Sequence, residues 1–229
     1  MTTRLRLDDP ATDVALRRSA RARRLTLRIS ARDGSVHLTV PPHVREAEIR
    51  RFLQAQAGWL RSRLAAAPPR IPVTHGMAVP FLGRPHPVTA AAGRSPRIAE
   101  GAIAVPGPSE TAGRRVAALL KSLARDRLTA AADRHAAALR RAPGRITLRD
   151  TGSRWGSCTS RGDLMFSWRL VMAPEDVLDY VAAHEAAHLV EMNHSPRFWG
   201  HVARLRPDWR IQRDWLRSHG ADLLRYDFG

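Results

Sequence analysis

The sequence predicts an α+β fold in which a small β-rich N-terminal region precedes a mostly helical C-terminal half that contains a short sheet. Apolar residues alternate with polar ones over residues 23–40, as in half-buried strands, and recur at helical spacing over residues 46–64 and again beyond residue 114. The chain has 229 residues, 44% hydrophobic and 26% charged, which is typical of a globular protein with a sizeable core. We expect two regions, residues 1–108 and residues 109–229.

The N-terminal region is predicted to contain a β-hairpin. RRLTLRIS (23–30) and SVHLTV (35–40) both alternate, and the ARDG segment between them is expected to turn the chain. A single helix is predicted from Glu46 to Leu64 because its apolar residues recur every three or four positions. Residues 70–108 are rich in Pro and Gly with short apolar pieces, which indicates short strands of a small sheet.

The C-terminal region is predicted to start with a long Ala/Leu/Arg-rich helix over residues 114–141, after a polar break at GPSETAG. RITLRD (145–150) and two short segments within residues 151–168 are predicted as strands. Pro174 and the acidic residues after it open a helix predicted to reach Met192. Ser195 and Pro196 are predicted to start another helix, and a last one begins at residues 207–209 and ends at Gly220.

The charge balance is strongly basic. Lys and Arg number 38 against 21 acidic residues, which gives a net charge of +17. Lys121 is the only lysine, a bias that GC-rich coding explains, but coding bias does not explain the shortage of acids. Two interpretations stay open: the excess charge binds a polyanion such as nucleotide or DNA, or it is solvated surface. The strongest basic cluster is RRSARARR (17–24), which is either such a site or a solvated tail leading into a strand.

Neither the apolar residues nor the cysteine content favours a membrane or secreted protein. No run of about 18 apolar residues occurs, and the N-terminus has no apolar signal segment. Cys158 is the only cysteine, so no internal disulfide can form, which fits a reducing compartment. We therefore expect a cytoplasmic protein with no membrane partner.

The segment HEAAHLVEMNHSPRFW (184–199) carries a candidate metal site. His184 and His188 are four residues apart on a predicted helix, so both imidazoles lie on one face and can reach one ion. Glu185 lies beside that face, where its carboxylate can contact a metal-bound water. This is the physical content of the H-E-x-x-H pattern, in which two histidines bind zinc and the glutamate is the general base.

His194 is the candidate third ligand. The chain must turn before it, and Asn193 can adopt the left-handed conformation that would swing His194 back. Three histidines and a water complete a catalytic zinc site, so we expect one Zn²⁺ per chain. The spacing matches the metzincin pattern H-E-x-x-H-x-x-G-x-x-H, except that Glu191 replaces the glycine and no Met-turn is recognisable. On a continuous helix Glu191 would lie about 10 Å along the axis from His184, which favours a place outside the ligand set.

The chain resembles the YgjP-like metallopeptidase family, relatives of the SprT-like zincins. The matching segments are RWGSC, the hairpin that ends at FSW, YVAAHEAAH, NHSPRFW and PDW, which lie within roughly residues 145–215. RRLTLRIS and GSVHLTVPPH also resemble the opening of the family. This combination is far more specific than H-E-x-x-H alone. Ala186 is a small departure, since the family usually carries Leu after the glutamate.

The resemblance implies a zincin-like C-terminal half, built from a short sheet and an active-site helix, with zinc on the three histidines and Glu185 as base. It also implies that the RWGSC strand packs beside that helix and lines the cleft. The candidate cleft residues are therefore Arg154, Trp155 and Ser157. Phe198 and Trp199 are expected to pack the following helix down and hold His194 in place.

These observations together predict a zinc-dependent hydrolase that acts on a peptide or protein. Zinc would activate a water, Glu185 would take its proton and pass it to the leaving group, and Arg154 or a backbone N–H would stabilise the oxyanion. One alternative is a metal-dependent nucleoside triphosphate hydrolase, although the phosphate loop GxxxxGK[ST] is absent. Another is a DNA-associated protease or binding protein.

Overall fold

The computed structural model describes residues 2–30, 34–66 and 69–229, and it confirms an α+β fold. The chain divides into two compact units, Met1–Arg70 and Ile71–Gly229, each of which is described by itself. This boundary differs from the one predicted from the sequence, which follows residue 108. The difference arises because the strands between residues 71 and 108 share one hydrophobic core with the long helix that follows them.

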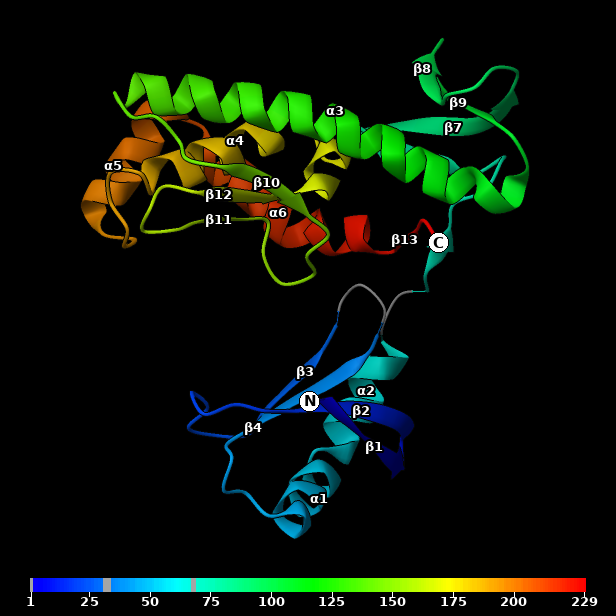
Figure 1. Ribbon diagram of the computed structural model, residues 1–229, viewed down its shortest axis with the longest axis vertical. Helices are drawn as coiled ribbons and strands as arrows, with labels where there is room; N and C mark the ends of the chain where they lie inside the picture. The colour runs from blue at the N-terminus through cyan, green and yellow to red at the C-terminus, as the bar shows by residue number, and fades with distance from the viewer. Residues whose placement is uncertain (1, 31–33, 67–68) are drawn as a thin grey trace. The chain divides into compact units, whose positions relative to one another are not determined.

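The first unit is a four-stranded sheet with two helices on one face (Figure 1). The strands run in the order β1-β2-β4-β3, with bounds Thr2–Asp8 (β1), Ala11–Arg18 (β2), Thr26–Ile29 (β3) and Val36–Val40 (β4). The predicted β3–β4 hairpin is confirmed, and its turn at residues 31–33 lies outside the described residues. The β1–β2 hairpin was not predicted, although Leu5, Leu7, Val14 and Leu16 alternate along it and are buried.

The helical segment of the first unit consists of two helices instead of the single predicted one. They are α1 (Glu46–Ala55) and α2 (Ala57–Ala65). Gln56 separates them with φ −93° and ψ 1°, so its backbone leaves the helical conformation for one residue. Ile49, Leu53 and Leu60 carry the buried side of this pair into the core of the sheet.

The second unit contains three sheets. The bounds are Ile71–Pro72 (β5), Ala78–Phe81 (β6), Arg84–Ala91 (β7), Arg97–Ala99 (β8), Ala102–Pro106 (β9), Ile146–Arg149 (β10), Gly156–Cys158 (β11), Leu164–Ser167 (β12) and Tyr226–Asp227 (β13). β6-β7-β9-β8 form one sheet, β10-β12-β11 another, and β5 pairs with β13. The predicted strands around residues 145–168 are thus confirmed, with β12 parallel to β10 and antiparallel to β11.

Two helices form the centre of the second unit. α3 (Ser109–Ala138) lies beside α4 (Glu175–Ala187), and α4 also contacts β11 (Figure 1). Both helices bury many alanines, which lets their backbones approach closely. Ala186 is fully buried in α4, where the small side chain suits this alanine-rich packing.

The remaining helices include one whose end differs from the prediction. η1 (Trp168–Met172) is a short 3₁₀ helix, α5 covers Pro196–Leu205 and α6 covers Trp209–Leu224. The prediction that Gly220 ends the last helix is wrong, because α6 continues for four residues beyond it. Gly220 is instead the site of a close contact, since a Cβ there would lie 2.9 Å from Trp155 Cζ2. No helix in the described part of the chain is long and apolar enough to cross a membrane.

Candidate metal centre

The three histidines predicted as ligands converge on one point. His184 Nε2 lies 3.2 Å from His194 Nε2, and one ring nitrogen from each of His184, His188 and His194 lies within 4.8 Å of the others. Two nitrogens bound to one tetrahedral zinc at 2.0–2.1 Å are about 3.3 Å apart. The donor set and its spacing therefore fit a zinc ion.

The end of α4 orients His188. The helix stops at Ala187, five residues before the predicted end, and the next N–H groups bond to Ala186 and Ala187 in a tightened turn. This turn brings the backbone carbonyl of Glu191 to 3.0 Å from His188 Nδ1, which donates to it. The hydrogen bond holds the tautomer that leaves Nε2 free for a metal.

The NHSP segment returns His194 to the helix by a turn different from the one expected. The left-handed conformation predicted for Asn193 is wrong, since the non-glycine residues with positive φ in the described ranges are Leu82, Glu100 and Arg140. Instead Asn193 Oδ1 accepts a hydrogen bond from the Ser195 N–H at 2.9 Å. A side-chain acceptor closes the turn, so no strained backbone is needed. Ser195 Oγ then caps α5 by accepting from the Phe198 N–H at 3.3 Å.

An aromatic shell holds the imidazoles in place. Phe198 is fully buried and stacks on His188 with ring centroids 4.4 Å apart, while the His194 centroid is 4.7 Å from it. Trp199 lies 5.8 Å from His194 and stacks on Trp209 at 4.3 Å. These contacts are the ones expected of Phe198 and Trp199. His188 is buried under this shell and His184 is half-buried, while His194 stays exposed to water.

Burial favours the neutral form of His184 and His188, which is the form that binds metals. It lowers the pKa of His184 to about 3, with a further contribution from the neighbouring His188 and His194. The pKa of His188 is also lowered, first by burial. His184 Nδ1 is buried and has no hydrogen-bond partner in the described part of the chain.

Glu185 lies between the metal-binding face of α4 and the strand β11. Its side chain is 5% exposed and contacts Gly156, where a Cβ would lie 2.6 Å from Glu185 Cγ and 2.7 Å from Cδ. Only glycine leaves room for the carboxyl group at this place. Burial raises the pKa of Glu185 to about 8, and the positive charge of Arg154 opposes that rise.

The predicted cleft residues fall on different faces of β11. Gly156 contacts Glu185, and the neighbouring Ser157 points to the opposite face, because side chains alternate along a strand. There Ser157 and Arg154 line a hollow of about 780 Å³, whose other basic residues are Arg145, Arg149 and Arg161. Trp155 lies against Gly220 of α6 as part of the core. Arg154 lines that hollow and its positive charge also acts on Glu185, whereas Ser157 and Trp155 are directed away from Glu185.

Comparison with known proteins agrees with this geometry. A family model described as a YgjP-like metallopeptidase domain matches residues 23–219. The chain belongs to the YgjP-like family. In the same comparisons, no curated protein and no solved structure gave a match. Membership of this family supports a peptidase-type enzyme that uses a metal ion, and the three histidines are the residues that can hold the ion.

A buried ionic network holds α4 in place in this YgjP-like chain, and this network was not predicted from the sequence. Asp179 Oδ2 accepts from Arg206 Nη1 at 2.6 Å, and Asp179 Oδ1 lies 2.9 Å from His135 Nε2 of α3. Burial raises the pKa of Asp179, but the hydrogen bonds from His135 and Arg206 outweigh it and hold that pKa well below its usual range. The sequence contained one signal for this network. Asp179 lies on a helix that is apolar on most sides, and a carboxylate that is buried must be paired.

Proposed function

We propose that this protein is a zinc-dependent metallopeptidase of the H-E-x-x-H type. His184, His188 and His194 would hold one Zn²⁺ per chain, and Glu185 would be the catalytic base. The observation that carries the proposal is the 3.2 Å approach of two imidazole nitrogens beside a buried glutamate that faces a glycine. We also propose a cytoplasmic location, since the one cysteine is a free thiol.

The chemistry divides between the metal and the protein. A bound zinc ion would supply a Lewis acid that acidifies water and polarises a carbonyl group. Glu185 would accept the proton of the attacking water and deliver it to the leaving amine. Burial raises the pKa of Glu185 to about 8, which favours holding a proton for the leaving amine, and the positive charge of a bound zinc ion would oppose this rise and favour the carboxylate that accepts the proton. Arg154, whose charge acts on Glu185, is the candidate for stabilising the oxyanion.

The strand beside Glu185 favours a peptide as the substrate. β11 is the last strand of its sheet, so one edge has no neighbouring strand among the described residues. The Trp155 carbonyl and the Thr159 N–H bond to the β12 side. Because backbone groups alternate in direction along an antiparallel strand, those of Gly156 and Cys158 point to the open edge. An extended peptide can pair there, next to the proposed base.

The proposal is tested by metal analysis and peptide hydrolysis. Purified protein should contain one zinc per chain, and His188→Ala should lose it. Glu185→Gln should retain zinc and lose at least 10²-fold in kcat, the usual contribution of a positioned general base. Glu191→Gln is the matched control, because it removes an acid close by whose backbone carbonyl, and not its carboxylate, contacts a ligand. Full activity of Glu185→Gln would refute the role of Glu185.

A second candidate is hydrolysis of a nucleoside triphosphate. It is favoured by the four arginines around the hollow on the outer face of the β10-β12-β11 sheet, which suit a polyphosphate. The hollow lies on the face of β11 opposite to the Gly156–Glu185 contact. A triphosphate bound in the hollow would therefore be poorly placed to react with Glu185 as the base. Release of phosphate or pyrophosphate from triphosphates, with peptide libraries left intact, would establish this candidate instead of the peptidase.

A further inference from the structure

The excess positive charge is concentrated in the first compact unit. Residues 1–70 contain 15 arginines and no lysine against six acidic residues, a net charge of +9. The remaining 159 residues contribute the other +8. A coding bias toward arginine would act on the whole chain, so it does not account for this asymmetry. The unit carries more than half of the charge in less than a third of the length.

Much of this charge gathers on the sheet face opposite to the helices. The apolar side chains Val14, Leu16, Val36, Leu38 and Val40 point into the core with α1 and α2. The alternate residues therefore point outward, and the register places Ala15, His37 and Arg28 in one row across β2, β4 and β3. Arg17, Thr39 and Thr26 form the next row.

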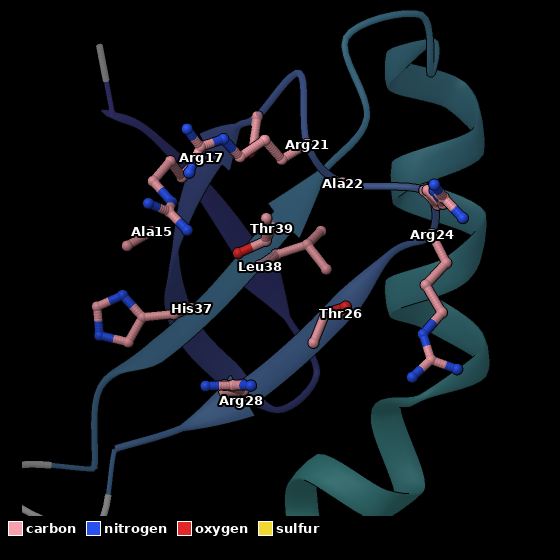
Figure 2. Close-up of a pocket in the computed structure, with 12 residues that line it drawn as sticks. Ala15, Arg17, Arg21, Ala22, Arg24, Thr26, Arg28, His37, Leu38 and Thr39 are labelled. Carbon is pink, nitrogen blue, oxygen red and sulfur yellow. The ribbon is translucent and has the colours of Figure 1, made fainter. Parts of the chain in front are cut away.

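These rows form the floor and rim of a hollow of about 920 Å³. Figure 2 shows basic side chains around Thr39 and Thr26. Arg17 and Arg21 lie together on one side, Arg24 lies on a second side and Arg28 on a third. Arg23 also lines it, and no acidic residue does. We call these five arginines, Arg17, Arg21, Arg23, Arg24 and Arg28, the sheet arginines. All five are exposed.

The sheet arginines differ from other arginines of the same unit. Arg6, Arg50 and Arg61 form ion pairs with Asp13, Glu46 and Asp9. Arg18 donates to the backbone carbonyls of Pro42 and Val44. In the described ranges none of the sheet arginines has a carboxylate or carbonyl partner of this kind. Five like charges held close together without counter-charges form a site for an external polyanion.

We propose that the sheet arginines bind the phosphate backbone of a nucleic-acid duplex. Arginine is suited to phosphate because its planar guanidinium donates two parallel hydrogen bonds. The described residues that line the hollow include no Phe, Tyr or Trp, and His37 is their one aromatic ring, whereas single-strand binding depends on several rings on which successive bases stack. A duplex requires none, because its bases are already stacked on one another and its phosphates lie along its outer surface. Contact through phosphates alone should be independent of base sequence.

The same residues argue against two other partners. A membrane-binding surface inserts large apolar side chains at the interface, and the hollow has none that is exposed. A protein interface is usually anchored by Trp and Tyr as well as by Arg, and neither Trp nor Tyr lines the hollow. Trp59, the exposed large hydrophobic residue of the described part of this unit, belongs to α2 and not to the lining.

The test is the salt dependence of binding by the full-length protein to a fluorescent 20-base-pair DNA duplex. Five phosphate contacts predict a slope of log K against log salt of about −4.5, equal for two unrelated sequences. Arg17→Gln/Arg28→Gln should reduce the magnitude of the slope by about 1.8 and weaken binding roughly 60-fold at 0.1 M salt. Circular dichroism should show that the variant is folded, since both side chains are exposed.

A matched control separates this site from net charge. Arg51→Gln/Arg63→Gln removes the same two charges from exposed positions on α1 and α2. It should leave the slope within experimental error of wild type. An equal loss in this control would overturn the proposal, as would no duplex binding at 0.05 M salt. Tighter binding of a single strand, or of phosphatidylserine vesicles, than of the duplex would also overturn it.

Discussion

Gly156 should be the most sensitive small residue of the candidate site. Its φ is not in the left-handed region, so the backbone itself would accept alanine. The obstacle is Glu185, since the added Cβ would lie 2.6 Å from Cγ and 2.7 Å from Cδ. Ordinary carbon–carbon contacts are about 3.5–4.0 Å, so the carboxyl group or β11 must move by about 1 Å. The substitution Gly156→Ala therefore displaces the proposed base without changing its chemistry.

The magnitude follows from that displacement. Misplacing a catalytic group by about 1 Å costs on the order of 10²-fold in rate. Overpacking a well-filled interior lowers the free energy of unfolding by about 1–3 kcal/mol. Alanine offsets about 0.4–1 kcal/mol of this loss, because its unfolded chain has fewer conformations than that of glycine. We thus expect Gly156→Ala to lower kcat/KM for a peptide about 100-fold and the free energy of unfolding by about 1–2 kcal/mol. Zinc content should not change, because the three histidines are not displaced.

The assays are zinc analysis, urea unfolding and hydrolysis of a fluorogenic peptide library. Gly200→Ala on α5 is the control, because nothing lies within 4 Å of a Cβ there. It should be fully active and gain about 0.5–1 kcal/mol from alanine in a helix. Adding Glu185→Gln to Gly156→Ala should cause little further loss of activity, since both act on one group. Wild-type activity and stability of Gly156→Ala would refute the reasoning.

Two further predictions concern the surroundings of the site. Asp179→Asn should lower the free energy of unfolding by about 2–3 kcal/mol at pH 7, because Arg134, His135 and Arg206 lose the carboxylate that they share, while Arg206 keeps Asp176 and Asp208 as partners. The folded-state pKa of Asp179 is depressed, so its contribution should be complete above about pH 5 and should diminish as the pH falls below the unfolded value of about 3.9. Urea unfolding of both proteins at pH 7 and pH 3 measures this, and a gap of constant size would contradict it. Gly220→Ala should destabilise α6 despite the higher helix propensity of alanine, because its Cβ would lie 2.9 Å from Trp155 Cζ2. A gain in thermal stability would show that Trp155 does not pack there.

The local elements were largely predictable because their signals lie within a few residues of one another. The β3–β4 hairpin, the N-cap at Ser195 and the helix α4, which carries His184 and has His188 as its C-cap, all follow from short spacings. The β1–β2 hairpin had the same alternating signal, but it was not predicted. Errors at helix ends had non-local causes. Gly220, for instance, lies inside α6 and not at its end, and it is a glycine because Trp155 fills the space that a side chain would occupy.

The sequence by itself determined the donor set. Two histidines at i and i+4 share a helical face whatever the rest of the chain does, and the family match covers residues 23–219. Only the tertiary structure decided how His194 returns, that Glu191 contributes a carbonyl instead of a carboxylate, and that Glu185 faces Gly156. It also decided that the arginines of β2, β3 and the loop between them lie together on one face. The physical reason is that strand pairing and helix packing join residues far apart in the chain, and their contacts leave no local pattern in the sequence.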